Sequence, residues 1–79
     1  FNQIENNLTK IYPNPAFDKI SVQSNTSYNH FCIFNLYGQP ILEGDLQNNE
    51  INISELSKGF FILKLANDKE YVQVKFMKE

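Results

Sequence analysis

The sequence predicts an all-β fold, an immunoglobulin-like antiparallel β-sandwich of about seven short strands. Apolar residues recur at alternate positions over short segments, as in strands with one buried face. Turn-forming residues separate these segments at intervals of about 8 to 12 residues. No long segment has the period of an amphipathic helix. The chain has 79 residues, enough for one domain with a single core.

The first part of the chain reads as a linker followed by a rigid corner. Residues 1–8 are polar and lack a sustained period, so we interpret them as the end of a linker and residues 9–79 as the domain. Residues 9–12 are expected to form a short edge strand. The proline corner, Tyr12-Pro13-Asn14-Pro15, cannot continue a helix or a central strand, because each proline fixes its own φ and lacks an N–H donor. We therefore expect this corner to set the direction of the next strand.

Six further strands are predicted, at residues 17–23, 30–36, 39–45, 50–54, 60–66 and 70–78. The second and third of these should form a hairpin around Tyr37-Gly38, and Pro40 suits a sheet edge. Residues 24–27, 48–49 and 67–69 carry the polar residues of turns. Ser54 to Gly59 is the one place where a helical turn is expected, with Ser54 as N-cap and Gly59 closing the turn in left-handed geometry.

The alternation also predicts the core, in which each well-buried large side chain contributes about 1.5 to 3 kcal/mol. Its members should interdigitate between two sheets. They are Ile20, Val22, Phe31, Ile33, Ile41, Ile51, Ile53, Leu56, Phe61, Leu63, Leu65, Val72, Val74 and Phe76.

Two of the predicted strands are apolar on their other face as well. In an immunoglobulin-like sandwich residues 30–36 and 60–66 lie side by side, so Phe34, Phe60 and Ile62 could form an exposed apolar patch suited to a partner. The alternative is that these are scattered surface residues, or that the linker or a preceding domain covers them. The sequence leaves both interpretations open.

Composition argues against several functions. Nine acidic and seven basic residues give a net charge of −2, without the basic patch that nucleic-acid binding needs. There is neither an apolar run of about 18 residues nor a signal-peptide core, so we expect no direct membrane insertion. Because the chain begins at Phe1, we interpret it as the end of a larger protein whose signal peptide lies at the other end.

The sequence offers no candidate catalytic residue, no metal site and no cofactor site, so we do not expect an enzyme. His30 is the single histidine and Cys32 the single cysteine, and nothing near them supplies an oriented base or an oxyanion site. Cys32 is expected to act as a small buried hydrophobe, with an intermolecular disulfide as the alternative.

An ordered set of motifs carries a family resemblance. After the proline corner come the apolar pair Ile20 and Val22, the segment 33–38 that ends at Gly38, the pattern Leu56-x-x-Gly59-x-Phe61, and a basic-apolar ending at residues 74–79. In this order and spacing, residues 11–79 resemble the C-terminal sorting domain of proteins that the type IX secretion system of Bacteroidetes exports. Phe61 stands where the family often has Tyr, and the last residue is Glu79 rather than a lysine.

The resemblance implies a role as a secretion signal. A cargo domain N-terminal in the same chain is exported to the periplasm, and the outer-membrane translocon and its shuttle proteins then recognise the sorting domain. The cargo reaches the outer-membrane surface or the medium, and a sortase-like surface protease commonly removes the domain and can attach the cargo to lipopolysaccharide. A cut of this kind would fall before Ile11.

A recognition mechanism follows from the last strand. If it lies at a sheet edge, a partner could read its unpaired backbone groups and its lysines by strand addition. The residues expected to be read are Lys75, Phe76, Met77, Lys78 and Glu79.

Two other functions remain open. One is an accessory carbohydrate-binding or adhesin-type module, for which Tyr28, Tyr37 and Tyr71 would be the stacking residues. The other is a dimerisation module that uses an open edge strand or Cys32.

Overall fold

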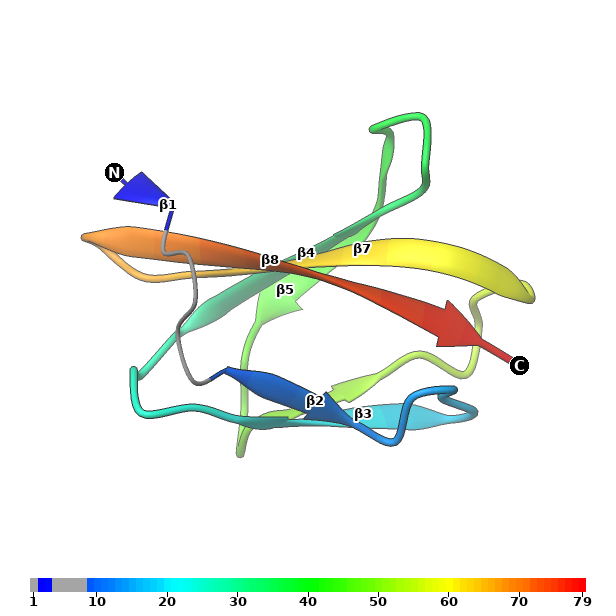
Figure 1. Ribbon diagram of the computed structural model, residues 1–79, viewed down its shortest axis with the longest axis horizontal. Helices are drawn as coiled ribbons and strands as arrows, with labels where there is room; N and C mark the ends of the chain where they lie inside the picture. The colour runs from blue at the N-terminus through cyan, green and yellow to red at the C-terminus, as the bar shows by residue number, and fades with distance from the viewer. Residues whose placement is uncertain (1, 4–8) are drawn as a thin grey trace.

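The computed structural model describes residues 2–3 and 9–79, and it confirms an all-β fold of two facing sheets (Figure 1). A five-stranded sheet has the order β1-β8-β7-β4-β5, and a three-stranded sheet has the order β2-β3-β6. The strands are β1 (Asn2–Gln3), β2 (Lys10–Tyr12), β3 (Lys19–Gln23), β4 (His30–Phe34), β5 (Pro40–Asp45), β6 (Glu50–Asn52), β7 (Gly59–Ala66) and β8 (Glu70–Lys78).

The seven predicted strands correspond to β2 through β8, and their order is that of an immunoglobulin-like sandwich. The third, fourth, sixth and seventh of them share one sheet, and the first, second and fifth share the other. As predicted, β4 and β5 form a hairpin and β5 is an edge strand. The strand β1 was not predicted: Asn2 and Gln3 pair in parallel with Glu70 and Tyr71. The rest of the segment interpreted as a linker lies outside the described residues.

The described residues include no helix that is long and apolar enough to cross a membrane.

The core lies between the two sheets and matches the alternation of the sequence. Phe76 is 1% exposed and stacks on Phe61, with 5.8 Å between the ring centres. Of the predicted core, all but Ile41 and Val74 are buried, and Val74 is half-buried against the core. Ala16 and Tyr28, from segments without alternation, are also buried in it.

The prediction that Ile41 belongs to the core is wrong, since this side chain is 47% exposed. Leu42 pairs with Ile33 in the row that faces the second sheet. The pairing then shifts by one residue, so that Phe34 pairs with Pro40 and Ile41 is the extra residue of a bulge. Leu42, half-buried, packs against the core in place of Ile41.

The helical turn predicted from Ser54 to Gly59 is also wrong. These residues form a non-helical turn instead, closed by one hydrogen bond in which the Leu56 N–H donates to the Ile53 carbonyl over 3.0 Å. Ser54 caps no helix, because its own N–H and hydroxyl both donate to the Asn52 side chain. Gly59 has the expected positive φ, but at +139° it is extended rather than left-handed helical, and it begins β7.

The predicted turns between strands are confirmed, and asparagine side chains hold several of them. Asn48 and Asn49 have φ of 54° and 55°, as a two-residue hairpin turn requires. The Asn67 carboxamide accepts hydrogen bonds from the N–H groups of Lys69 and Glu70 between β7 and β8.

Candidate recognition surface

The last strand, β8, occupies an unusual place in the five-stranded sheet. One edge pairs with β7 along the whole strand, from Tyr71 opposite Ala66 to Lys78 opposite Gly59. The other edge meets β1 only at its first two residues. At its far end it meets Ala16, which forms a parallel bridge with Lys78. Within residues 2–3 and 9–79, no strand pairs with residues 72–76 on this outer edge.

The proline corner holds the end of β8 in place. The Ala16 N–H donates to the Met77 carbonyl over 2.8 Å, and the Glu79 N–H donates to the Ala16 carbonyl over 2.7 Å. The Met77 N–H donates to Oδ1 of Asn14 over 3.1 Å. Both peptide bonds that precede the corner's prolines are cis. We call the contacts of Asn14 and Ala16 with Met77 and Glu79 the C-terminal clasp.

The clasp gives the corner a role that the sequence analysis missed. The sequence predicted a change of direction, but it carried no signal that the corner would bond to residues 63 positions further along the chain. Ala16 is completely buried, so it also belongs to the core at this point.

The five residues expected to be read by a partner do not form a free tail. Phe76 lies in the core, and Lys78 is only 9% exposed, with its Nζ donating to the Glu79 carbonyl over 2.9 Å. The assumption that Lys78 is open to a partner is therefore wrong, because alternation turns it to the same side as Phe76. Lys75 and Glu79 are exposed and Met77 is half-buried.

Among the described residues, the backbone of β8 nevertheless has a short stretch without a partner strand on its outer edge. In an antiparallel pair, the backbone N–H and carbonyl of every second residue point to the same edge of the strand. The Met77 groups point outward to the clasp, so the backbone groups of Lys75 and Gln73 point outward as well. Lys75 also presents its side chain to solvent. A partner strand at this edge would find backbone donors and acceptors next to a lysine.

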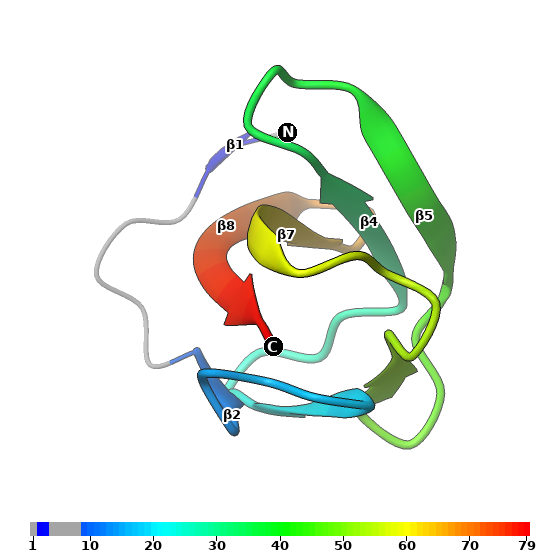
Figure 2. The same ribbon diagram turned by 90° about the vertical axis from the view of Figure 1, so that its right-hand side faces the viewer.

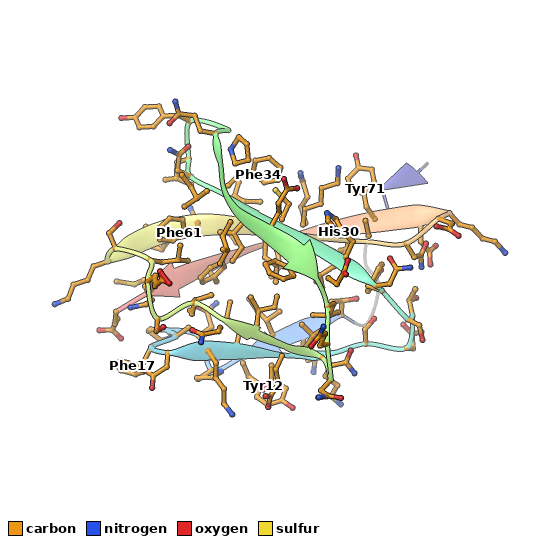
Figure 3. All side chains as sticks on the ribbon, turned by 180° about the vertical axis from the view of Figure 1, so that it is seen from behind. Tyr12, Phe17, His30, Phe34, Phe61 and Tyr71 are labelled. Carbon is orange, nitrogen blue, oxygen red and sulfur yellow. The ribbon has the colours of Figure 1, made fainter. Side chains whose placement is uncertain are left out.

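The three residues of the predicted apolar patch lie together on the face of the five-stranded sheet that is turned away from the second sheet, here called the outer face. Phe34 and Ile62 are partners across β4 and β7, and Phe60 is two residues from Ile62 along β7. Phe60 is 48% exposed, and the other two are half-buried. Figure 3 shows Phe34, His30 and Tyr71 pointing outward on this face, whereas Phe61 points between the sheets.

Two lysines lie over aromatic rings of the outer face. Nζ of Lys75 is 4.8 Å from the centre of the Phe60 ring, and Nζ of Lys64 is 4.6 Å from that of Tyr71. Such contacts hold a cation against an apolar surface. A hollow of about 280 Å³ lies beside them, between the β4–β5 loop and the sheet, lined in part by Phe34, Leu36 and Ile62.

Four titratable residues lie at the other side of the outer face: His30, Cys32, Glu43 and Asp45. Nε2 of His30 lies 3.7 Å from Glu43, and Nδ1 lies 4.0 Å from Asp45. The Cys32 thiol beside them is buried, and its pKa is raised by that burial and by the Glu43 carboxylate, against a smaller opposite effect of Lys64. Among the described residues, no three His, Cys, Asp or Glu side chains gather as metal ligands would.

The motif residues of the later part of the chain lie in a loop, in the core and at the start of a strand. Gly38, at φ +84°, closes the β4–β5 loop, and Asn35 accepts hydrogen bonds there from Tyr37 and Gln39. Leu56 is a core residue. Gly59 starts β7 opposite Lys78.

The three tyrosines considered for a carbohydrate-binding module lie apart. Tyr28 is buried, Tyr71 lies under Lys64, and Tyr37 is 91% exposed at the tip of the β4–β5 loop. They do not form the pair of coplanar exposed rings that such a module requires.

Comparison with known proteins agrees with this organisation. Residues 10–79 match the model of a family described as the secretion system C-terminal sorting domain. The chain is also similar to beta-agarase D of Zobellia galactanivorans, with 34% identity over 57 residues. That match covers 72% of this chain but only 12% of the agarase. Both the motifs and the matched span thus lead to one assignment: the chain belongs to the family of type IX secretion-system C-terminal sorting domains.

Proposed function

We propose that this domain directs an N-terminal cargo protein across the outer membrane. Translocon and shuttle proteins recognise it by adding a strand of their own to the outer edge of β8. The cargo first reaches the periplasm and then the outer-membrane surface or the medium. The domain carries no reaction of its own in this proposal. A sortase-like protease on the cell surface would supply the chemistry of cleavage before Ile11 and of attachment.

Among residues 2–3 and 9–79, no strand pairs with the middle of β8 on its outer edge, and this observation supports the mechanism. The clasp fixes one end of β8 and β1 pairs with its beginning, so the outward groups of Gln73 and Lys75 stay in extended geometry between them. An edge strand held in extended conformation at both ends is a ready template for a partner strand. Lys75 would add a charge that the partner can recognise.

The test is secretion of a fluorescent cargo fused to residues 1–79 in a Bacteroidetes host. Deleting residues 75–79 should trap the fusion in the periplasm, but this deletion also removes Phe76 from the core. A sharper variant is Lys75→Pro, which removes one outward N–H and leaves the bonds to β7 intact, since proline is tolerated at a free strand edge. The matched control is Lys75→Ala, which keeps the N–H and removes only the charge.

We expect the Lys75→Pro fusion to accumulate in the periplasm, and the Lys75→Ala fusion to be secreted, although more slowly than the unchanged domain because the recognised charge is lost. Circular dichroism and the unfolding midpoint of the purified variants establish that both are folded. Normal secretion of a folded Lys75→Pro fusion would refute strand addition at this edge. A cargo that leaves the cell equally well without residues 1–79 would refute the sorting role itself.

A further inference from the structure

The outer face of the five-stranded sheet has an ordered distribution of charge. Residues paired across β8, β7, β4 and β5 form three rows, which read Tyr71, Ala66, His30 and Asp45, then Gln73, Lys64, Cys32 and Glu43, then Lys75, Ile62, Phe34 and Pro40. The acidic groups all lie on β5, and the lysines lie on β7 and β8. The apolar residues are between them or beside the lysines.

The charges at the two sides of this face are open to solvent. The side chains of Glu43 and Asp45 are 65% and 85% exposed. Lys75 is exposed, and Lys64 is half-buried with its Nζ over the Tyr71 ring. His30 lies in the first row on β4, next to Asp45 of β5.

The β4–β5 loop adds an apolar projection at one end of the same face. Figures 1 and 2 both show this loop rising from the sheet on the side away from β2 and β3. Leu36 and Tyr37 on the loop are 56% and 91% exposed. At the same end, on the other side of the face, lie Phe60 and its cross-strand partner Met77.

We propose that the outer face is an interface between two copies of this chain, related by a two-fold axis that runs parallel to the strands between β4 and β7. This rotation places β5 of one copy over β8 of the other, and β4 over β7. Glu43 then faces Gln73 of the second copy, with Lys64 and Lys75 of that copy on either side. Phe34 faces Ile62, and the projecting loop faces Phe60 and Met77.

Charge decides between this arrangement and the other two-fold packing of the same face. An axis in the interface but perpendicular to the strands would place β5 over β5, so that Glu43 and Asp45 would meet a second pair of carboxylates. Like charges across an interface are unfavourable, whereas opposite charges select and orient the partner. A face that is acidic at one side, basic at the other and apolar between them is thus complementary to itself only about the parallel axis.

The size of the face predicts a weak and transient dimer. Four strands spaced by about 4.8 Å, over about 20 Å of their length, give a flat contact of roughly 300 Å². Stable interfaces bury about 800 Å² on each partner. The dimer should therefore appear only as the protein concentration approaches about 1 mM, where weak interfaces become populated. This inference is independent of the proposed sorting role.

The experiment is sedimentation equilibrium of the 79-residue chain under reducing conditions, so that Cys32 cannot form a disulfide. The unchanged chain should rise in average mass from 9.2 kDa toward twice that value with concentration. Glu43→Lys and Lys64→Glu should each remain monomeric, because Glu43→Lys places like charges beside Lys64 and Lys75 of the other copy and Lys64→Glu places one beside Glu43. An equimolar mixture of the two variants should dimerise more strongly than either variant alone, because position 43 of each copy then lies beside a charge of opposite sign at position 64 of the other copy.

The chain offers matched controls for both changes. Glu55→Lys and Lys58→Glu alter the net charge equally at exposed positions of the turn before β7, and they should dimerise like the unchanged chain. Circular dichroism of all variants checks the fold. A chain that stays monomeric at every concentration overturns the proposal. So does a dimer that Glu43→Lys does not weaken, or a mixture of the reversed variants that stays monomeric.

Discussion

Asn14 is the residue whose side chain explains most about the proline corner. Its Oδ1 accepts the outward N–H of Met77, at a point where β8 has no neighbouring strand among the described residues. The family motif thus contains an asparagine that bonds to the end of the chain, between two prolines that limit the conformation of the corner.

Replacing Asn14 with alanine should lower the free energy of unfolding by about 0.5 to 1.5 kcal/mol, the usual net contribution of one hydrogen bond. Chemical denaturation measures this loss, and hydrogen exchange of the Met77 amide should become faster. Asn25→Ala, at an exposed position in the turn after β3, is the control and should change neither quantity. Unchanged exchange at Met77 in Asn14→Ala would contradict the role assigned to this side chain.

Cys32 shows how the outer face affects a single titratable group. Burial and the Glu43 carboxylate raise the pKa of the thiol, so the folded chain holds less thiolate than the unfolded chain at the same pH. The resulting stability is fully present below the pKa of the unfolded thiol and is lost as the pH rises through the higher pKa of the folded thiol.

Alkylation by iodoacetamide at mildly alkaline pH should therefore be slower in the folded chain than in urea. Glu43→Gln removes one of the causes that raise the pKa, so it should speed alkylation of the folded chain. Glu55→Gln, which changes a carboxylate distant from Cys32, should leave the rate unchanged. If Glu43→Gln reacts no faster than the unchanged chain, the carboxylate has no electrostatic effect on the thiol.

At the scale of the elements, the strands could be predicted because the cause of each is local. Residues 70–78 alternate in the sequence, and β8 has these bounds. At this scale one error arose from pairing with a neighbouring strand and another from a competing local hydrogen bond. Alternation alone predicts Ile41 inside, but the bulge that pairing with β4 imposes opposite Phe34 turns this side chain to solvent. Ser54 has the residue type of an N-cap, but its N–H and hydroxyl both donate to the Asn52 side chain two residues earlier.

The β4–β5 hairpin depends on the left-handed residue that ends its loop. Gly38→Ala should destabilise the protein by about 1 to 2 kcal/mol, because φ of +84° is unfavourable for a residue with a Cβ atom. No atom lies near the added Cβ, so the cost is conformational and not steric contact. Gly38→Asn should lose less, since asparagine tolerates this conformation. The unfolding midpoints in urea measure both, and equal losses would contradict this explanation.

At the scale of the whole molecule, the sequence predicted the two sheets but not what joins their ends. The alternation of apolar residues identifies the residues of each sheet face, and the order of the family motifs identifies the domain. The clasp depends on one carboxamide and the backbone of Ala16, and it connects positions too distant for any periodicity to relate. The charge order of the outer face became visible only once the register across four strands was known.

Deleting residues 75–79 should therefore unfold the domain rather than merely trim it. The deletion removes Phe76 from the core, a loss of about 3 to 5 kcal/mol by analogy with Phe→Ala replacements, and it also removes the clasp. We expect the truncated chain to lack a cooperative urea transition. Deleting Glu79 alone, which breaks one clasp bond, is the control and should preserve the transition. A cooperative transition in the longer deletion would show that the domain folds without its last strand complete.

The clasp also has a consequence for synthesis of the protein. Asn14 is translated 63 residues before its partner Met77, so this side of the clasp forms only after β8 has left the ribosome. A product that terminates prematurely within β8 lacks that partner and keeps its open hydrophobic interior. Under the proposed sorting role, a product that stops within β8 would fail to fold as a sorting domain, so export would depend on translation through this strand.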